Sequence, residues 1–368
     1  MDHFQSIWLY DNSTTAFINN SVEAELAGGT AFELMDETSD YQYFGFPRRV
    51  STVIFKLAVA GSLGALTWEY TDDSADADSW ARTIPQVDSS LNSTTHDNYV
   101  ILKPIPNWAS VAFSTTKPHA VASVPDTTAR FWLRVSAASI TTAATVNEIQ
   151  CVPYAHYTTP SRVSAALQIA DFSTSTQPTL AEVEDTIRSV ESRLDYRVKK
   201  SWRYNLQTNE YHGFNLSGIR LRKDNVRDVI SLQIWDGASF ETKTGSEDDR
   251  KNDYFFIPEE GMVYFSRYFL LPARLAYVGP HWWGWGVGEF TKAIKITYIW
   301  GRDKDTDERG YEVELLATKM AAIELFRSHD YSAWAISGSD RVPISQKIDQ
   351  WTIEVEDGLE SLRGWEVI

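Results

Sequence analysis

The segment TLAEVEDTIRSVESRLDYRV, which starts at Thr179, constrains the fold more than any other part of this 368-residue chain. Thr179 and Glu182 have the spacing of a capping box, and Pro178 precedes the cap. Apolar residues then recur every three or four positions: Leu180, Val183, Ile187, Val190 and Leu194. Glu184 and Arg188 are four residues apart and predict an exposed ion pair on another face. The sequence therefore predicts a helix of about five turns that buries one apolar stripe.

Two later segments predict helices by the same criterion. Residues 311–328 carry one stripe, formed by Val313, Leu316, Met320, Ile323 and Phe326. Residues 342–364 begin near a candidate cap, Ser345, and end at Gly364. Their stripe consists of Ile348, Trp351 or Thr352, Val355, Leu359 and Leu362. We therefore expect three amphipathic helices in the second half of the chain.

Strand patterns occupy the rest of the chain. Between the first two helices, ISLQIW, YFFIPEEGMVYF and AIKITYIWG have strand and turn patterns, which predict a β-insert at about 205–301. Before residue 172, at least eight short apolar or alternating runs are separated by turn-forming stretches. These runs, which include SIWLY, YQYFGF, STVIFKLAVA and ARFWLRV, predict a β-sandwich or jelly roll.

The expected fold class is therefore multidomain α+β. Residues 157–179 are rich in Ser, Thr and Pro and have weak periodicity, which is typical of a linker. We place a β-sandwich domain at 1–172 and a helical domain with its β-insert at 173–368.

Composition excludes several classes of function. The net charge of −16 opposes general binding to nucleic acid, although an acidic wall suits a lumen through which DNA passes without sticking. The only cysteine, Cys151, cannot form an internal disulfide. No leader peptide is recognisable at the N-terminus, and no segment approaches 18 uninterrupted apolar residues, so neither export nor membrane insertion is expected.

Catalytic and cofactor motifs are absent from the sequence. It contains none of the common nucleotide-binding or acyl-transfer signatures, and its seven histidines have no zinc-ligand spacing. We therefore expect no enzyme activity and no cofactor. The one metal candidate is a calcium loop formed by Asp303, Asp305, Asp307 and Glu314. Its sixth position is Glu308 instead of glycine, and an acidic turn before a helix is favourable without any metal, so no metal is the expectation.

Two groups of tryptophans suggest binding surfaces. Trp282, Trp283 and Trp285 lie among glycines in VGPHWWGWGVGEF, where they either cap the local sheet or form an assembly-interface loop. In the first domain, aromatic faces could form a sugar platform, and the candidates are Trp8, Trp68, Trp80, Trp108 and Trp132. The position of Trp132 in the middle of FWLRV favours a place in the core.

The order of helix, β-insert, helix and final helix resembles the head–tail connector (adaptor) family of tailed bacteriophages and archaeal viruses. The similarity covers about residues 177–368, from PTLAEVEDTIRSVESRLDYRVKKSW through AIKITYIWG to ELLATKMAAIELF. It implies a homo-oligomeric ring, usually twelvefold, between the portal protein and a tail-completion (stopper) protein. Viral DNA would pass through its lumen without sequence-specific binding. The family also implies a portal contact by the C-terminal segment, here Gly364, Trp365, Glu366, Val367 and Ile368.

The N-terminal half has no counterpart in the smallest members of that family. Its ARFWLRVSAASITTAATVNEI is similar to β-sandwich modules of virion and other surface proteins, and it could meet capsid or fibre proteins. The sequence therefore predicts a structural virion protein of the neck, assembled in the host cytoplasm. The alternative is a carbohydrate-binding or adhesion virion protein that uses the β-sandwich.

Overall fold

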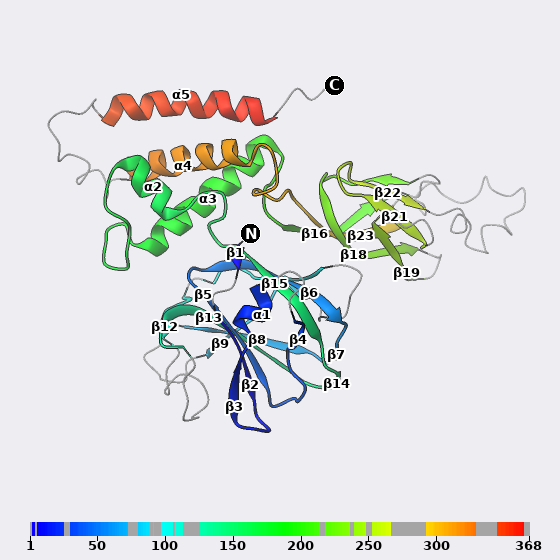
Figure 1. Cartoon of the computed structure of the whole chain (residues 1–368). Coiled ribbons are helices and arrows are strands. Elements are labelled where there is room, and N and C mark those ends of the chain that lie inside the picture. The colour runs from blue at the N-terminus through cyan, green and yellow to red at the C-terminus, as the bar shows by residue number, and fades with distance from the viewer. Residues whose placement is uncertain are drawn as a thin grey trace, which may run out of the picture. The chain divides into compact units, whose positions relative to one another are not determined.

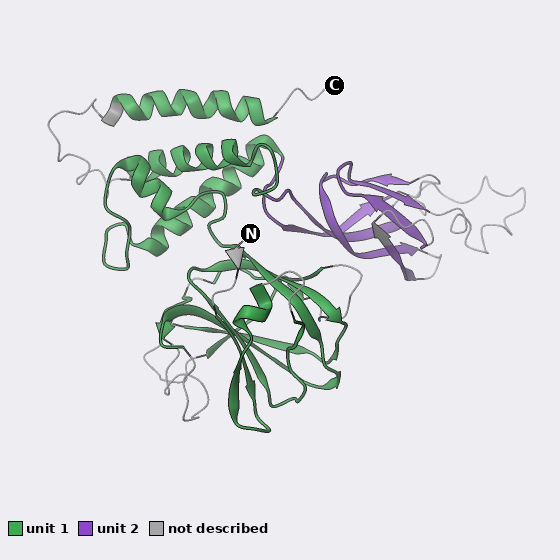
Figure 2. Ribbon diagram, viewed as in Figure 1, with its two compact units in different colours: residues 1–199, 304–368 green, residues 200–303 purple. Residues whose placement is uncertain are grey.

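The computed structural model divides the chain into two compact units, residues 1–199 with 304–368 (unit 1) and residues 200–303 (unit 2) (Figure 2). It describes the whole chain except residues 1, 4–5, 26–29, 73–79, 89–90, 92–96, 106, 113–125, 214–217, 236–238, 248–251, 266–291, 329–343 and 364–368. Unit 1 contains both β-sheets and helices, whereas the described part of unit 2 is built of strands (Figure 1). Unit 1 spans both sides of residue 172.

Two antiparallel sheets form the first part of unit 1. The first has the order β1-β15-β6-β11-β10, with β4 beside β15. Its strands are β1 (Asp2–His3), β4 (Phe32–Glu33), β6 (Val50–Val59), β10 (Val87–Asp88), β11 (Asn98–Ile101) and β15 (Thr145–Pro153). The second has the order β3-β2-β5-β13-β8-β9, with β12 beside β13. Its strands are β2 (Ser6–Asp11), β3 (Ala16–Asn19), β5 (Tyr41–Phe46), β8 (Leu66–Thr71), β9 (Trp80–Thr83), β12 (Ser110–Ala112) and β13 (Ala129–Ala137).

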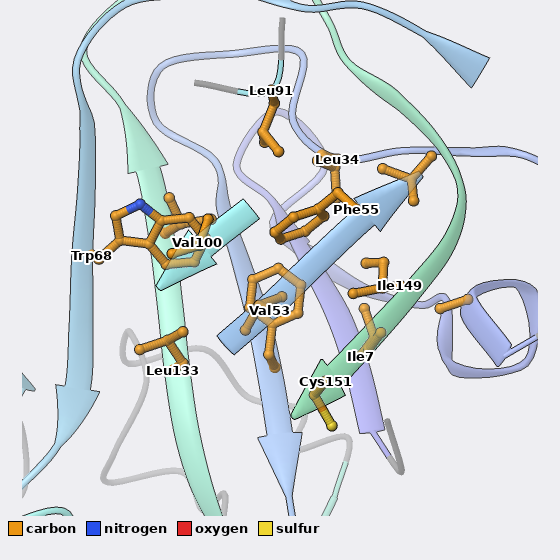
Figure 3. Packing of buried hydrophobic residues seen from close by; sticks show 14 of the residues in the cluster. Ile7, Leu34, Val53, Phe55, Trp68, Leu91, Val100, Leu133, Ile149 and Cys151 are labelled. Carbon is orange, nitrogen blue, oxygen red and sulfur yellow. The ribbon is translucent and has the colours of Figure 1, made fainter. Parts of the chain in front are cut away.

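The inner faces of these sheets share one hydrophobic core (Figure 3). Alternate residues along each strand point to the same face, so Phe44 and Phe46 of β5 and Leu133 and Val135 of β13 enter this core. The core also receives Ala24 from a short helix, α1 (Ser21–Glu25). A small pair, β7 (Ser62–Leu63) with β14 (Ile140–Thr142), lies outside the two sheets. The structure confirms the predicted α+β class with an N-terminal β-sandwich.

All three predicted helices are present. They are α3 (Leu180–Val198), α4 (Gly310–Arg327) and α5 (Ile344–Arg363), and each packs on the other two. The capping box at the start of α3 is formed in both directions, because the Thr179 hydroxyl accepts from the Glu182 N–H and the Glu182 carboxylate accepts from the Thr179 N–H.

The predicted apolar stripe of α3 is buried. Val183, Ile187 and Val190 share a cluster with Ala321, Ala322 and Leu325 of α4, and the side chain of Leu194 is also fully buried.

The interpretation of residues 157–179 as a linker is wrong in part, because Pro160–Leu167 form a further helix, α2. Thr159 caps it, Pro160 opens it, and Val163 joins the same cluster as the α3 stripe. Two turns are too short to produce a recognisable apolar period, so the Ser and Thr content dominated the prediction.

Unit 2 contains two four-stranded sheets, ordered β16-β23-β18-β19 and β17-β22-β21-β20. The strands are β16 (Asn205–His212), β17 (Ile219–Arg220), β18 (Val226–Trp235), β19 (Phe240–Lys243), β20 (Gly245–Glu247), β21 (Tyr254–Ile257), β22 (Met262–Phe265) and β23 (Ile294–Trp300). Residues of both sheets share one core, including Leu232, Phe256, Val263, Ile296 and Tyr298.

Candidate functional site

A buried ion pair connects the sandwich of unit 1 to α3. Arg49, just before β6, places its Nε 2.7 Å from Oε2 of Glu184, and both side chains are nearly inaccessible to solvent. Its Nη2 also donates to the Ala181 carbonyl and to Asp185, each at 3.0 Å, and its guanidinium lies over the ring of Tyr154. Burial raises the pKa of Glu184, and the neighbouring Arg49 opposes that shift. The exposed ion pair predicted for Glu184 and Arg188 is therefore wrong, because Glu184 is buried against Arg49.

A second buried carboxylate lies two turns further along α3. Oε1 of Glu191 accepts the backbone N–H groups of His156 and Tyr157, both at 2.6 Å, and the Tyr157 hydroxyl bonds to Asp195. Burial raises the pKa of Glu191 from its ordinary value of 4.5 to about 7, although Arg188 and the two N–H groups oppose the shift. Burial also lowers the pKa of the His156 imidazole to about 3. Polar groups of α3 thus hold the segment that follows β15.

Glu191 should make unit 1 more stable at acidic than at neutral pH. Between about pH 4.5 and pH 7 the folded chain keeps a proton that the unfolded chain has lost, so this contribution is complete below the lower value and disappears as pH rises through the upper one. His156 has the opposite effect on stability, because its lowered pKa makes the folded chain less stable as the pH falls below the ordinary histidine pKa of 6.5. A comparison of the wild type with Glu191→Gln isolates the carboxyl, because the amide keeps an acceptor oxygen.

We expect the free energy of unfolding of the wild type, relative to Glu191→Gln, to be greater at about pH 5 than at about pH 8 by on the order of 2 kcal/mol. Urea unfolding followed by far-ultraviolet circular dichroism measures it. If the free energies of unfolding of the wild type and Glu191→Gln changed with pH in the same way, Glu191 would be ionised in the folded chain at both pH 5 and pH 8.

The outer surface of the helices combines ion pairs with exposed apolar side chains. Arg197 of α3 forms a bidentate pair with Glu356 of α5, and other pairs join α3 to α4 and α4 to α5: Arg193–Glu324 and Lys319–Glu354. Such exposed pairs stabilise little. The most exposed large apolar side chains on these helices are Tyr196, Tyr311, Leu315 and Ile353, of which Tyr196 is 85% exposed. The outward face of α5 is acidic, with Asp349, Asp357 and Glu360 exposed.

The outer face of the second sandwich sheet carries a layer of aromatic side chains. We call it the outer aromatic layer, and its members are Trp8, Tyr10, Phe17, Tyr41, Tyr43, Trp80, Val111 and Trp132. Tyr10, Tyr43 and Trp132 are buried beneath the others, whereas Trp8, Phe17, Tyr41 and Trp80 are half-buried. The sheet therefore has aromatic residues on both faces.

The structure separates the five tryptophans proposed as a sugar platform. Trp68 and Trp108 belong to the sandwich core, so neither ring is available to a ligand. Trp132 is fully buried but belongs to the outer aromatic layer, with Trp8 and Trp80. The assembly-loop residues (Trp282, Trp283 and Trp285) and the C-terminal portal-binding residues (364–368) lie outside the described part of the chain, and both assignments stay predictions.

The acidic loop before α4 has partners other than a metal. Lys304 pairs with Asp305, the N–H of Arg309 donates to Asp307, and Glu314, the fourth calcium candidate, lies within α4 and pairs with Arg162 at 2.8 Å. In the described part of the chain, no three His, Cys, Asp or Glu side chains are grouped so that they could hold a metal ion, and the four calcium candidates form no such group.

Sequence reasoning missed the residues that join α3 to the sandwich. Glu184, Glu191 and Asp195 share one face of α3, but acidic residues recur in the same way on solvated helix faces, so the pattern alone was ambiguous. The outer aromatic layer had a clearer signal. In ARFWLRV, Trp132 alternates with Phe131 and Leu133, which shows that neither face of β13 is simply polar.

None of the helices in the described ranges combines the length and the apolar character needed to cross a membrane. No protein-family profile matches the chain, and no curated protein matches it.

Several solved structures resemble the chain distantly. A chain from the neck of an empty GTA particle has 14% identity and a TM-score of 0.34, covering 60% of this chain and 95% of its own. A chain from the virion of the native gene transfer agent (GTA) particle has 11% identity and a TM-score of 0.32, covering 55% and 92%. A pectin-binding carbohydrate-binding module has 9% identity and a TM-score of 0.25, covering 41% and 91%. All three similarities are remote.

Proposed function

We propose that this chain is a structural protein of the neck of a tailed virus or virus-like particle, and that it acts as a head–tail adaptor instead of an enzyme. In this role it forms a closed ring between a portal protein and a tail-completion protein, and DNA passes through the lumen. The support comes from the order and packing of the chain's own elements, since the likeness to the neck structures is remote.

The observation that carries the proposal is the insertion of a β unit between two helices that pack on each other. The chain leaves α3 at Val198, builds unit 2, and returns to begin α4 at Gly310. Despite the intervening residues, the α3 stripe packs on α4, and Arg193 pairs with Glu324. The helical part is therefore one module interrupted by a β-insert, which is the order that the connector resemblance implies.

The charge of the helical module is compatible with a conduit. Asp349, Asp357 and Glu360 are exposed on α5, and the whole chain has a net charge of −16. A lumen lined by such a face repels phosphates, so DNA would slide without being bound. Residues 364–368 then contact the portal, and the loop that contains Trp282, Trp283 and Trp285 meets a neighbouring subunit.

The test is assembly of the full chain with the portal protein of the same virus or particle. We expect a closed ring of uniform stoichiometry, detected by light scattering after size exclusion and by electron microscopy of the complex. A variant that lacks residues 364–368 should still fold, as judged by circular dichroism, but should no longer bind the portal.

One result would contradict the whole proposal, and another would contradict only the C-terminal contact. A full chain that stays monomeric in the presence of the portal excludes the adaptor role. Equal portal binding by the full chain and the shortened variant would retain that role but remove the C-terminal contact. Glu360→Gln, on the exposed acidic face of α5, serves as a control that leaves residues 364–368 intact.

A further inference from the structure

The outer aromatic layer is unusual for a sandwich. An antiparallel sheet of this kind usually has an apolar inner face and a polar outer face. Here the inner face of the second sheet already supplies the core, and the outer face adds a separate cluster in which every member but Val111 is aromatic. Trp8, Phe17, Tyr41 and Trp80 are only half-buried, so part of this apolar layer stays in contact with water, and apolar surface left in water marks a place where something can bind.

The rings of this layer are held in fixed positions. Trp80 of β9 reaches across β8 and β13 to meet Tyr43 edge-on, with 5.7 Å between ring centroids, and Phe17 reaches Tyr43 from the other side at 5.9 Å. The indole N–H of Trp132 donates to the Val111 carbonyl at 3.0 Å, and that of Trp8 donates to the Ser6 hydroxyl at 2.7 Å. A ligand would therefore meet a preorganised surface and would order few side chains on binding.

A charged pair lies in the middle of the layer. Arg134 is opposite Tyr43 on one side and Glu69 on the other, and its Nε donates to Glu69 at 2.7 Å. Its guanidinium carbon lies 4.4 Å from the centre of the Trp80 ring and 4.9 Å from that of Tyr41. Because Glu69 balances the charge of Arg134, the pair offers donors and acceptors for hydroxyl groups without a strong preference for an ion.

We propose that the outer aromatic layer binds a glycan chain, whose pyranose rings stack on Trp8, Tyr41 and Trp80 and whose hydroxyl groups bond to Arg134 and Glu69. A glycan fits this surface because the flat C–H face of a pyranose complements an aromatic ring, and its hydroxyl groups need nearby donors and acceptors, which Arg134 and Glu69 supply. This function is independent of the proposed neck role and would give unit 1 a binding activity of its own.

Native gel electrophoresis of the full chain tests the proposal. The gels contain one soluble polysaccharide each, from a panel of a cellulose derivative, xylan, mannan, galactan and polygalacturonate. We expect at least one polysaccharide to retard the wild type. Titration calorimetry with oligosaccharides of that polymer should then show a loss of affinity of about tenfold or more for Tyr41→Ala and for Trp80→Ala.

Two further variants separate binding from folding. Trp80→Phe keeps an aromatic ring and should retain part of the affinity, while Trp235→Ala removes a half-exposed tryptophan from unit 2 and should bind as the wild type does. The proposal is overturned if no polysaccharide retards the wild type, or if Tyr41→Ala and Trp80→Ala bind as well as Trp235→Ala. If these two layer variants fail to bind other particle proteins while no polysaccharide is bound, the layer is a protein interface instead.

Discussion

Replacement of Glu184 by alanine is expected to lower the free energy of unfolding of unit 1 by about 3–5 kcal/mol. The substitution leaves the guanidinium of Arg49 buried at the junction with only Asp185, the Ala181 carbonyl and the Tyr154 ring as partners. A buried cation that keeps only the largely exposed carboxylate of Asp185 is far more costly than one that also has the buried carboxylate of Glu184. Urea unfolding followed by far-ultraviolet circular dichroism measures the effect, because all described helices belong to unit 1.

Two comparisons make this result specific. Asp185→Asn removes a carboxylate that is 58% exposed, and it should cost less than about 1 kcal/mol. The double variant Arg49→Met with Glu184→Leu removes both charges and should recover most of the lost stability. If Glu184→Ala costs no more than Asp185→Asn, the buried pair does not stabilise the junction.

Replacement of Gly301 by alanine is expected to destabilise unit 2 by about 3 kcal/mol or more. Gly301 ends β23 with a φ of +128°, a conformation that side chains rarely adopt. An added Cβ would also lie 2.0 Å from the carbonyl oxygen of Arg203, which is backbone and cannot rotate away. Faster hydrogen exchange in peptides from β16 and β23 should report the loss.

Gly358→Ala provides the matched control within α5. The nearest atom to an added Cβ there is a methyl group of Leu316, at 2.5 Å, which belongs to a flexible side chain. Alanine also favours the helix by about 1 kcal/mol over glycine, so the net change should stay within about 1 kcal/mol. If Gly301→Ala and Gly358→Ala lost similar amounts of stability, the close approach of the Arg203 carbonyl and the positive φ would not be what excludes a side chain at Gly301.

The sequence predicted the features that depend on local apolar periodicity and on residues that start or end helices and strands. The Thr179 cap, the stripe from Val183 to Leu194, and the glycine that ends AIKITYIWG all have a local physical cause. The eight predicted strands of the sandwich were equally visible, because turn-forming residues separate them.

What the sequence did not predict depends on residues that are distant in the chain. Glu184 contacts Arg49, which is 135 positions away in the chain. The sequence does not show that partner, and an acidic residue on a helix without a partner is normally exposed. The sandwich tryptophans show the same limit. Their alternation along each strand predicts two faces, but only the pairing of β5 with β2 and β13 shows that Tyr43 and Trp8 share a surface with Arg134.

The hydrogen bond between Ser201 and Arg302 has a consequence for how such a chain can evolve. The carbonyl oxygen of Ser201 accepts the N–H of Arg302 at 2.8 Å, so the two ends of unit 2, which runs from Lys200 to Asp303, are side by side. Because the two ends of the insert meet, an insert of a different size would leave the distance between α3 and α4 unchanged. We therefore expect α3 and α4 to keep their packing when a different β-insert replaces unit 2.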